Sequence, residues 1–325
     1  MKQLKKHWIK YLIAAVVLAA LPLVLPNNYY VQIINIVGIN AILVMGFNIL
    51  AGYTGQISLG QAAFYAIGAY ASALLNTRFG LPFWVTLPAA MLTSGLFGLL
   101  LAVPALKVKG KYLVLLTIGF GEIVRLVLLN WKEVTGGTSG VLRIQPPAFF
   151  SFQFDTLPKY YYLILAFVIL LFLYQKKLIN SRAGRALIAI REDEAAAELV
   201  GISLSKYKIK VFVIGAVFCG IGGCLYAHMV RYVSPDCFRY DESVMILSMA
   251  VIGGIGTQAG PLLGSFLLTL LPELLRQAGD YRLVIYGVLL ILVIMFYPGG
   301  LIQGLESLKA KLAGRNTRKG GLKAS

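Results

Sequence analysis

Long apolar runs separated by short polar segments fill most of the chain. They lie at about 9–25, 31–51, 57–77, 82–104, 112–129, 160–175, 209–230, 241–256, 257–275 and 283–298. A run of about 18 or more apolar residues has the length that an α-helix needs to cross the hydrocarbon core of a bilayer. The pattern therefore predicts an all-α polytopic membrane protein with about ten transmembrane helices.

Composition and charge agree with this class. The 325-residue chain is 58% hydrophobic and 13% charged, whereas soluble domains carry about 25% charged residues. Its net charge of +17 would suggest nucleic-acid binding in a soluble protein. In a membrane protein, Lys and Arg instead mark the segments on the cytoplasmic side. We therefore expect no nucleic-acid partner.

The distribution of basic residues predicts the orientation. With the N-terminus inside, 21 of the 30 Lys and Arg residues fall in inside segments and eight in outside segments. This bias predicts that both termini are cytoplasmic, that residues 176–208 form a cytoplasmic segment and that residues 130–159 form a folded external loop. Residues 1–304 are expected to form one transmembrane domain, followed by a basic, partly disordered cytoplasmic tail at 305–325.

Motifs of enzymes and metal sites are missing from the sequence. The three cysteines form no CxxC pair, and His7 and His228 lie far apart, so we expect no metal site. There is no GxxxxGK[ST] phosphate-binding loop and no HExxH motif. We therefore expect a non-enzyme without a cofactor of its own.

The longest mixed-charge segment of the chain is Arg182–Ser205. Four charged residues are followed at once by a small apolar stretch and then by a glycine: Arg191, Glu192, Asp193, Glu194, Ala195, Ala196 and Gly201. Acidic residues favour a helix N-terminus, and glycine commonly follows a last turn. The pattern predicts one short helix from about Arg191 to Val200, with Ala195, Leu199 and Ile202 on its apolar side.

Two interpretations of this helix remain open. It could lie at the membrane interface with its arginines on lipid phosphates. Alternatively, it could dock onto a soluble partner, because an acidic cluster is repelled by an anionic leaflet and a small alanine face fits a protein groove.

A second group of polar residues lies in or beside the apolar runs. Glu122 and Arg125 are spaced to pair within one span, either to lock helices together or to line a polar path. The uncharged candidates for that path are Gln56, Ser58, Gln61 and Thr117. Three further residues, Asn35, Asn40 and Asn48, are expected to form hydrogen bonds between helices.

Glycines punctuate two stretches of similar composition, Gly52–Gly60 and Gly253–Gly264. Within the second stretch, Gly256, Gly260 and Gly264 recur every four residues, as on one face of a helix. Close helix packing is the expected role, and shaping of a pore is the alternative. An inverted internal repeat of two sets of five spans remains open.

Several segments resemble one family of membrane proteins. Residues 186–208, ALIAIREDEAAAELVGISLSKYK, resemble the cytoplasmic coupling segment of ABC importer permeases, in which an EAA-type helix docks onto the ATPase. The similarity is greatest to the permease subunit of branched-chain amino-acid importers. It extends over GYTGQISLGQAAFYAIGAY (52–70), residues 106–126, residues 130–141 and residues 232–276.

The resemblance implies a function and a set of partners. It implies one permease half of an ATP-driven importer for branched-chain or similar hydrophobic amino acids, in the bacterial cytoplasmic (inner) membrane. Partners would be a second, related permease, two cytoplasmic ABC ATPases that bind ATP, an extracytoplasmic substrate-binding protein and lipid. Glu194, Ala195, Ala196 and Gly201 would take the docking role. A urea or short-amide permease of the same family and an ion-coupled transporter are the alternatives.

Overall fold

The computed structural model describes residues 22, 27–108, 110–149 and 152–275, with isolated positions at 281, 287, 288, 291, 295 and 300–302. The expected spans at 9–25 and 283–298 lie outside the described residues, apart from isolated positions, as does the basic tail at 305–325.

Helices make up most of the described chain. In chain order they are α2 (Asn28–Phe47), the π-helix η1 (Asn48–Gly52), α3 (Gln61–Phe79), α4 (Phe83–Ala105), α5 (Lys111–Asn130), α6 (Lys132–Thr135), the 3-10 helix η2 (Gly137–Ser139), α7 (Leu157–Ile179), α8 (Arg182–Glu192), α9 (Glu194–Leu199), α10 (Leu204–Val230), the 3-10 helix η3 (Pro235–Phe238), α11 (Tyr240–Gly253) and α12 (Gly260–Leu274). Four strands of two residues each complete the elements: β1 (Val141–Leu142), β2 (Ala148–Phe149), β3 (Phe152–Gln153) and β4 (Tyr232–Val233).

Five helices in the described residues are long and apolar enough to cross a membrane: α2 with η1, α4, α5, α7 and α10. Their length and composition fit a multi-pass membrane protein. The expected total of about ten spans and the cytoplasmic placement of both termini remain predictions.

The expected spans at 241–256 and 257–275 are shorter in the structure. They form α11 with 14 residues and α12 with 15, joined by a turn at 254–259. Helices of this length rise about 21 to 23 Å, which is less than the roughly 30 Å of a hydrocarbon core. The glycines of the turn end α11 early, and Gly254 has a φ of 115° that a helix cannot continue.

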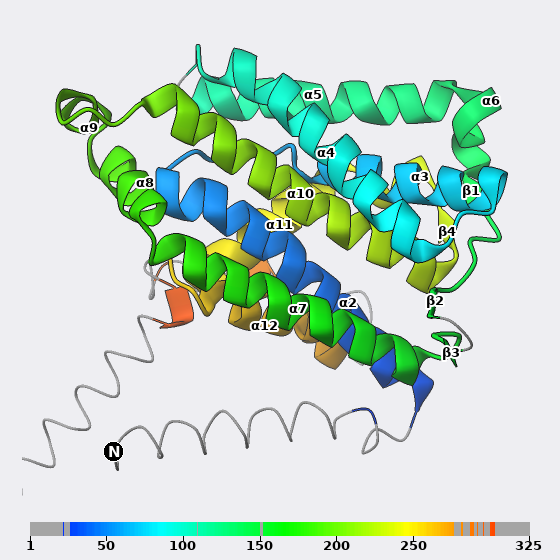
Figure 1. Cartoon of the computed structure of the whole chain (residues 1–325). Helices are drawn as coiled ribbons and strands as arrows, with labels where there is room; N and C mark the ends of the chain where they lie inside the picture. The colour runs from blue at the N-terminus through cyan, green and yellow to red at the C-terminus, as the bar shows by residue number, and fades with distance from the viewer. Residues whose placement is uncertain are drawn as a thin grey trace, which may run out of the picture.

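At the centre of the bundle, α10 packs against α2, α3 and α4 (Figure 1). Glycines on α10 allow the close approach. A Cβ on Gly223 would overlap the Tyr65 carbonyl on α3, and a Cβ on Gly220 would lie 2.8 Å from the Ala90 carbonyl oxygen on α4. Because packing and not hydrophobic exclusion joins helices in lipid, such contacts stabilise the bundle.

The three intramembrane asparagines form the predicted hydrogen bonds between elements. Asn35 donates to the Leu157 carbonyl of α7 at 3.1 Å, and Asn40 donates to Thr269 Oγ1 of α12 at 2.9 Å. Asn48 donates to the Thr257 carbonyl in the turn before α12 at 2.8 Å.

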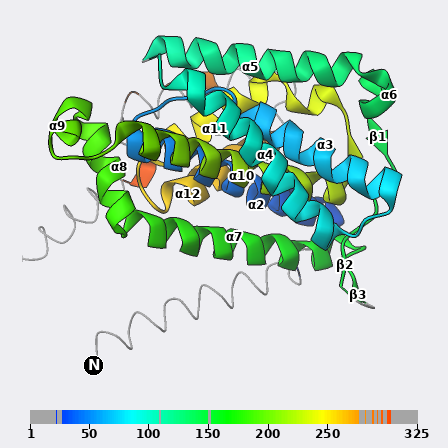
Figure 2. The same cartoon turned by 45° about the horizontal axis from the view of Figure 1, so that its top comes forward.

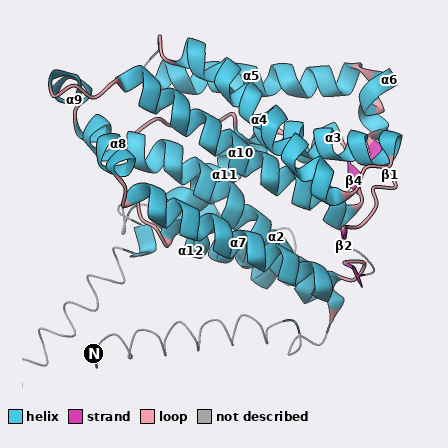
Figure 3. Ribbon diagram, viewed as in Figure 1, coloured by secondary structure: helices cyan, strands magenta, loops and turns pink. Residues whose placement is uncertain are grey.

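The segment α8–α9 and the segment from α6 to β3 occupy opposite ends of the molecule in both orientations (Figures 1 and 2). All four strands of the described residues lie at the second of these ends (Figure 3). There β1 pairs antiparallel with β4, with Val141 opposite Val233, and β2 pairs with β3. The described residues between α5 and α7 thus form α6, η2, β1, β2 and β3, and the side of the membrane on which they lie remains a prediction.

Candidate functional site

The mixed-charge segment forms two helices where the sequence predicted one. α8 ends at Glu192, Asp193 is extended with a φ of −156°, and α9 begins at Glu194. The Asp193 carboxylate causes the break by accepting hydrogen bonds from the amides of Ala195 at 2.8 Å and Ala196 at 3.0 Å. Aspartate is a preferred residue at this N-cap position because it satisfies amides that have no partner within the helix.

Gly201 ends α9, as the sequence predicted. Its φ of 83° is left-handed, and the amide of the next residue, Ile202, donates to the Ala197 carbonyl at 3.0 Å. Glycine is the residue that adopts this conformation without strain. A Cβ at this position would meet no described atom within 4 Å, so only the backbone conformation requires glycine.

The tip of α9 presents apolar side chains outward. Leu199 is 89% exposed and Val200 is 76% exposed, so the apolar side of the helix faces away from the protein. Ala195, Ala196 and Glu192 are also exposed, and only Ala197 is buried. An apolar tip surrounded by charge is typical of a surface that a protein or a membrane covers.

Glu194 fastens α9 to α10. Its Oε1 lies 2.6 Å from Lys208 Nζ, and the Lys208 side chain is 8% exposed. A salt bridge in such a buried setting is costly to break, because removing one partner leaves the other charge without compensation. Sequence reasoning missed Lys208, since nothing in a run of three lysines shows which one turns inward.

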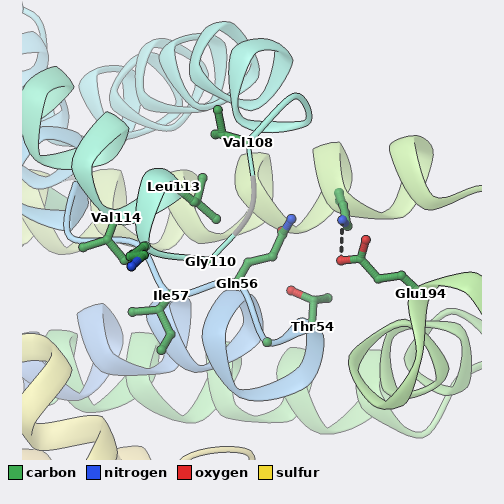
Figure 4. Close-up of a pocket in the computed structure, with 11 residues that line it drawn as sticks. Thr54, Gln56, Ile57, Val108, Gly110, Leu113, Val114 and Glu194 are labelled. Carbon is green, nitrogen blue, oxygen red and sulfur yellow. Dashed lines mark hydrogen bonds and ion pairs between the residues drawn. The ribbon is translucent and has the colours of Figure 1, made fainter.

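The Glu194–Lys208 pair borders a cavity of about 360 Å³ (Figure 4). The cavity lies between the loop after η1 and the beginning of α5, and its wall includes Thr54, Gln56 and Lys111. Gln56 is therefore a buried residue that faces a cavity, as a path-lining residue would. No other of the uncharged candidates lines it.

Ser58, Gln61 and Thr117 are buried and use their polar atoms inside the protein. Thr117 Oγ1 accepts from the Leu59 amide at 2.9 Å and so fixes α5 to the loop before α3. Ser58 Oγ accepts from the Gly60 amide at 3.3 Å, and Gln61 Oε1 accepts from Cys219 at 2.9 Å. The structure brings these residues together around the start of α3.

Glu122 and Arg125 form the predicted ion pair at 3.0 Å. Their side chains are 42% and 27% exposed, and the pair lies along α5 instead of joining two helices. Glu122 also borders a small pocket with Leu59 and Ser243.

The three spaced glycines do not share one helical face. Gly256 lies in the turn before α12 with a φ of 79°, and only Gly260 and Gly264 belong to α12. Close packing is confirmed for Gly264, where a Cβ would overlap the Met249 carbonyl of α11. The prediction that the three glycines lie on one helix was wrong, because Gly256 belongs to the turn that precedes α12.

Arg191, at the end of α8, reaches the bundle. Its Nη1 donates to the Gly52 carbonyl at the end of η1 at 2.8 Å. Burial raises the pKa of the neighbouring Tyr53 to about 12, and the positive charge of Arg191 opposes that rise. Arg191 is therefore a direct link between the mixed-charge segment and the first described span.

Within the described residues, no group of three or more His, Cys, Asp or Glu side chains is placed to hold a metal ion. The three cysteines are free thiols, and Cys219 and Cys224 are buried.

Comparison with known proteins places this architecture in a family. Residues 29–294 match the permease component of branched-chain amino acid transport systems. The chain belongs to this family. The match covers the described spans, apart from Asn28 at the start of α2, and the whole α8–α9 segment.

Two groups of relatives are similar over most of the chain. The high-affinity branched-chain amino acid transport system permease protein LivM of Escherichia coli is 36% identical over 315 residues, covering 90% of this chain and 74% of the relative. The permease protein LivH of Salmonella typhimurium is 25% identical over 288 residues, covering 81% of this chain and 90% of the relative. No solved structure matches the chain.

Proposed function

We propose that this chain is one permease subunit of an ATP-driven importer of branched-chain or similar hydrophobic amino acids in the bacterial cytoplasmic membrane. The observation that carries the proposal is the α9 tip. It exposes Leu199 and Val200 at the end of a membrane protein of this family, while Glu194 and Arg191 connect it to the bundle. An exposed apolar tip that is joined to the bundle by a salt bridge and a hydrogen bond is suited to receive a displacement from a bound partner.

The partners follow from the family. Relatives of two types, LivM and LivH, match this chain, which supports a pair of related permeases in one importer. The chain carries no phosphate-binding loop, so we assign ATP to two cytoplasmic ATPase subunits. An extracytoplasmic binding protein would deliver the substrate to the opposite end of the bundle.

The transport step begins at α9 in this proposal. Closure of the ATPases displaces α9, and the Glu194–Lys208 salt bridge passes the displacement to α10. Because α10 packs closely against α2, α3 and α4, its movement shifts the bundle as a body. Alternating access from one side to the other then follows from rocking of the spans.

The docking role is tested by charge reversal at the connection. Glu194→Arg places two positive charges together beside Lys208, and Gly201→Trp adds a bulky side chain at the exposed end of α9 in a backbone conformation that disfavours it. Both variants should insert into the membrane, fail to co-purify with the ATPases and lose uptake of labelled leucine. Glu133→Arg, the same charge change on the exposed surface of α6 at the other end of the molecule, is the matched control for membrane insertion and ATPase association.

Other outcomes point to other functions. Normal transport and ATPase association in the Glu194→Arg/Gly201→Trp double variant would refute docking through α9. Uptake that persists without ATP and collapses with an ion gradient would instead favour ion-coupled transport. Uptake of labelled urea in place of leucine would identify the amide-transporting branch of the family.

A further inference from the structure

The two glycine-rich stretches meet in the folded chain, although about 200 residues separate them. Gly52, in the first stretch, lies so close to Gly256, in the second, that a Cβ on Gly52 would be 2.6 Å from the Gly256 amide nitrogen. Glycine is needed here because the two backbones are in contact.

Asn48 holds this contact from inside the π-helix η1. It is fully buried. Its Oδ1 accepts from the Gly256 amide at 2.7 Å and its Nδ2 donates to the Thr257 carbonyl at 2.8 Å. One side-chain amide thereby holds two successive residues of the turn between α11 and α12. π-Helical turns are rare and often occur at functional positions.

Arg191 reaches the same place from α8. Its Nη1 bonds the Gly52 carbonyl, and a Cβ on Gly256 would lie 2.7 Å from that nitrogen. The guanidinium therefore lies against both glycine stretches, and the Gly256 conformation, with a φ of 79°, leaves the space that it occupies.

The turn at 254–259 leads into the interior through α11. Near the beginning of α11, Ser243 Oγ accepts from the Ala62 amide in the first turn of α3 at 3.0 Å. Leu59, just before α3, is held by Thr117 of α5. A shift of the turn along the α11 axis would therefore reach the point where α3 begins and α5 passes.

We propose that Arg191 and Asn48 are positioning residues of a transmission junction, which joins the α8–α9 segment to the turn at 254–259 and through α11 to the start of α3. This inference rests on the proposed function. The junction is a second route beside the Glu194–Lys208 connection to α10. In this proposal its residues act by their position and not by contact with substrate. They convert a displacement of α8 into a displacement of α11.

The test uses the complete importer reconstituted in proteoliposomes with its ATPases, its sister permease and its binding protein. Leucine uptake and ATP hydrolysis are measured together. Arg191→Gln and Asn48→Ala should still co-purify with the ATPases and hydrolyse ATP near the wild-type rate. Uptake per ATP hydrolysed should fall about tenfold, the factor that follows from losing a charge-assisted or buried hydrogen bond.

Two controls separate this junction from charge and from general stability. Arg185→Gln removes the same charge from an exposed position of α8 and should leave uptake per ATP unchanged. Arg191→Lys keeps the positive charge and one donor nitrogen and should recover part of the loss. The Arg191→Gln/Asn48→Ala double variant should have an uptake per ATP no lower than that of the more impaired single variant, because both residues serve one route. If Asn48→Ala does not fold, Arg191→Gln on the surface still decides the question.

The proposal is overturned if both variants keep the wild-type uptake per ATP, or if uptake and hydrolysis fall in the same proportion together with thermal stability. The second result would mean that the contacts serve folding only. Failure of the proposed function would look different, because the wild-type complex itself would then show no ATP-dependent leucine uptake.

Discussion

α5 and α10 have the same hydropathy and different environments. The most apolar 18-residue stretch of each helix has a mean hydropathy of 2.0. In α5, 17% of that stretch is buried inside the protein, whereas in α10 67% is buried. α10 lies between α2, α3 and α4, whereas α5 lies along the edge of the molecule (Figure 2). Hydropathy therefore indicates which segments enter a membrane and does not distinguish a neighbouring helix from lipid.

Glycine shows the same difference at single positions. Gly220 and Gly223 of α10 are in contact with other helices, so a side chain there has no space. Gly119 of α5 has no described atom within 4 Å of its Cβ position. A small residue indicates close packing only where a second helix occupies the space beside it.

The largest effect is expected for Gly223→Leu in α10. The new side chain would overlap the Tyr65 carbonyl of α3, and overpacking of this kind costs about 3 kcal/mol. Thermal unfolding of the purified protein in detergent should show the loss, together with a lower yield in the membrane. An unchanged melting temperature would mean that α10 is not closely packed against α3.

A smaller loss is expected for Thr117→Val, which removes the one described side-chain contact from α5 to the Leu59 amide. That buried amide would be left without its partner, at a cost of about 1 to 2 kcal/mol. Thr93→Val on α4 is the matched control, because Thr93 Oγ1 bonds only carbonyls of its own helix in the described structure. Equal melting temperatures for the two variants would contradict the role of Thr117.

Gly119→Leu in α5 should not destabilise the isolated chain and should raise its stability by about 0.5 to 1 kcal/mol, because glycine is an unfavourable residue inside a helix. The position is open, so no described neighbour has to move. The same unfolding experiment measures it against Gly223→Leu. A strong destabilisation would show that α5 is closely packed and would remove the contrast between the two helices.

The smallest effect is expected for Glu122→Gln. The Glu122–Arg125 pair lies along one half-exposed face of α5, and exposed pairs contribute about 0 to 1 kcal/mol. Leucine uptake should keep its dependence on ATP and remain near the wild-type rate. A collapse of uptake would instead make Glu122 part of the transport path and favour ion coupling.

Much of the site was visible in the sequence, but its connections were not. Asp193, Glu194 and Gly201 indicated the beginning and the end of a helix, since caps and stops are local features of the chain. The break at Asp193 was missed because the same residues, from Arg191 onward, are equally compatible with one continuous helix. Lys208 and Gly52 were missed as partners because no local pattern shows which distant carbonyl or lysine a side chain will meet.

The sequence by itself determined that this is a helical membrane protein, where most of its helices begin and end, and which segment has the longest mixed-charge sequence. These properties follow from runs of apolar residues, from capping and from glycine, all of which act within a few residues. Only the tertiary structure decided that α10 is central and α5 peripheral, and that Arg191, Gly52 and Gly256 meet. Those facts depend on which helix surfaces face each other, and that arrangement is determined by packing over the whole bundle.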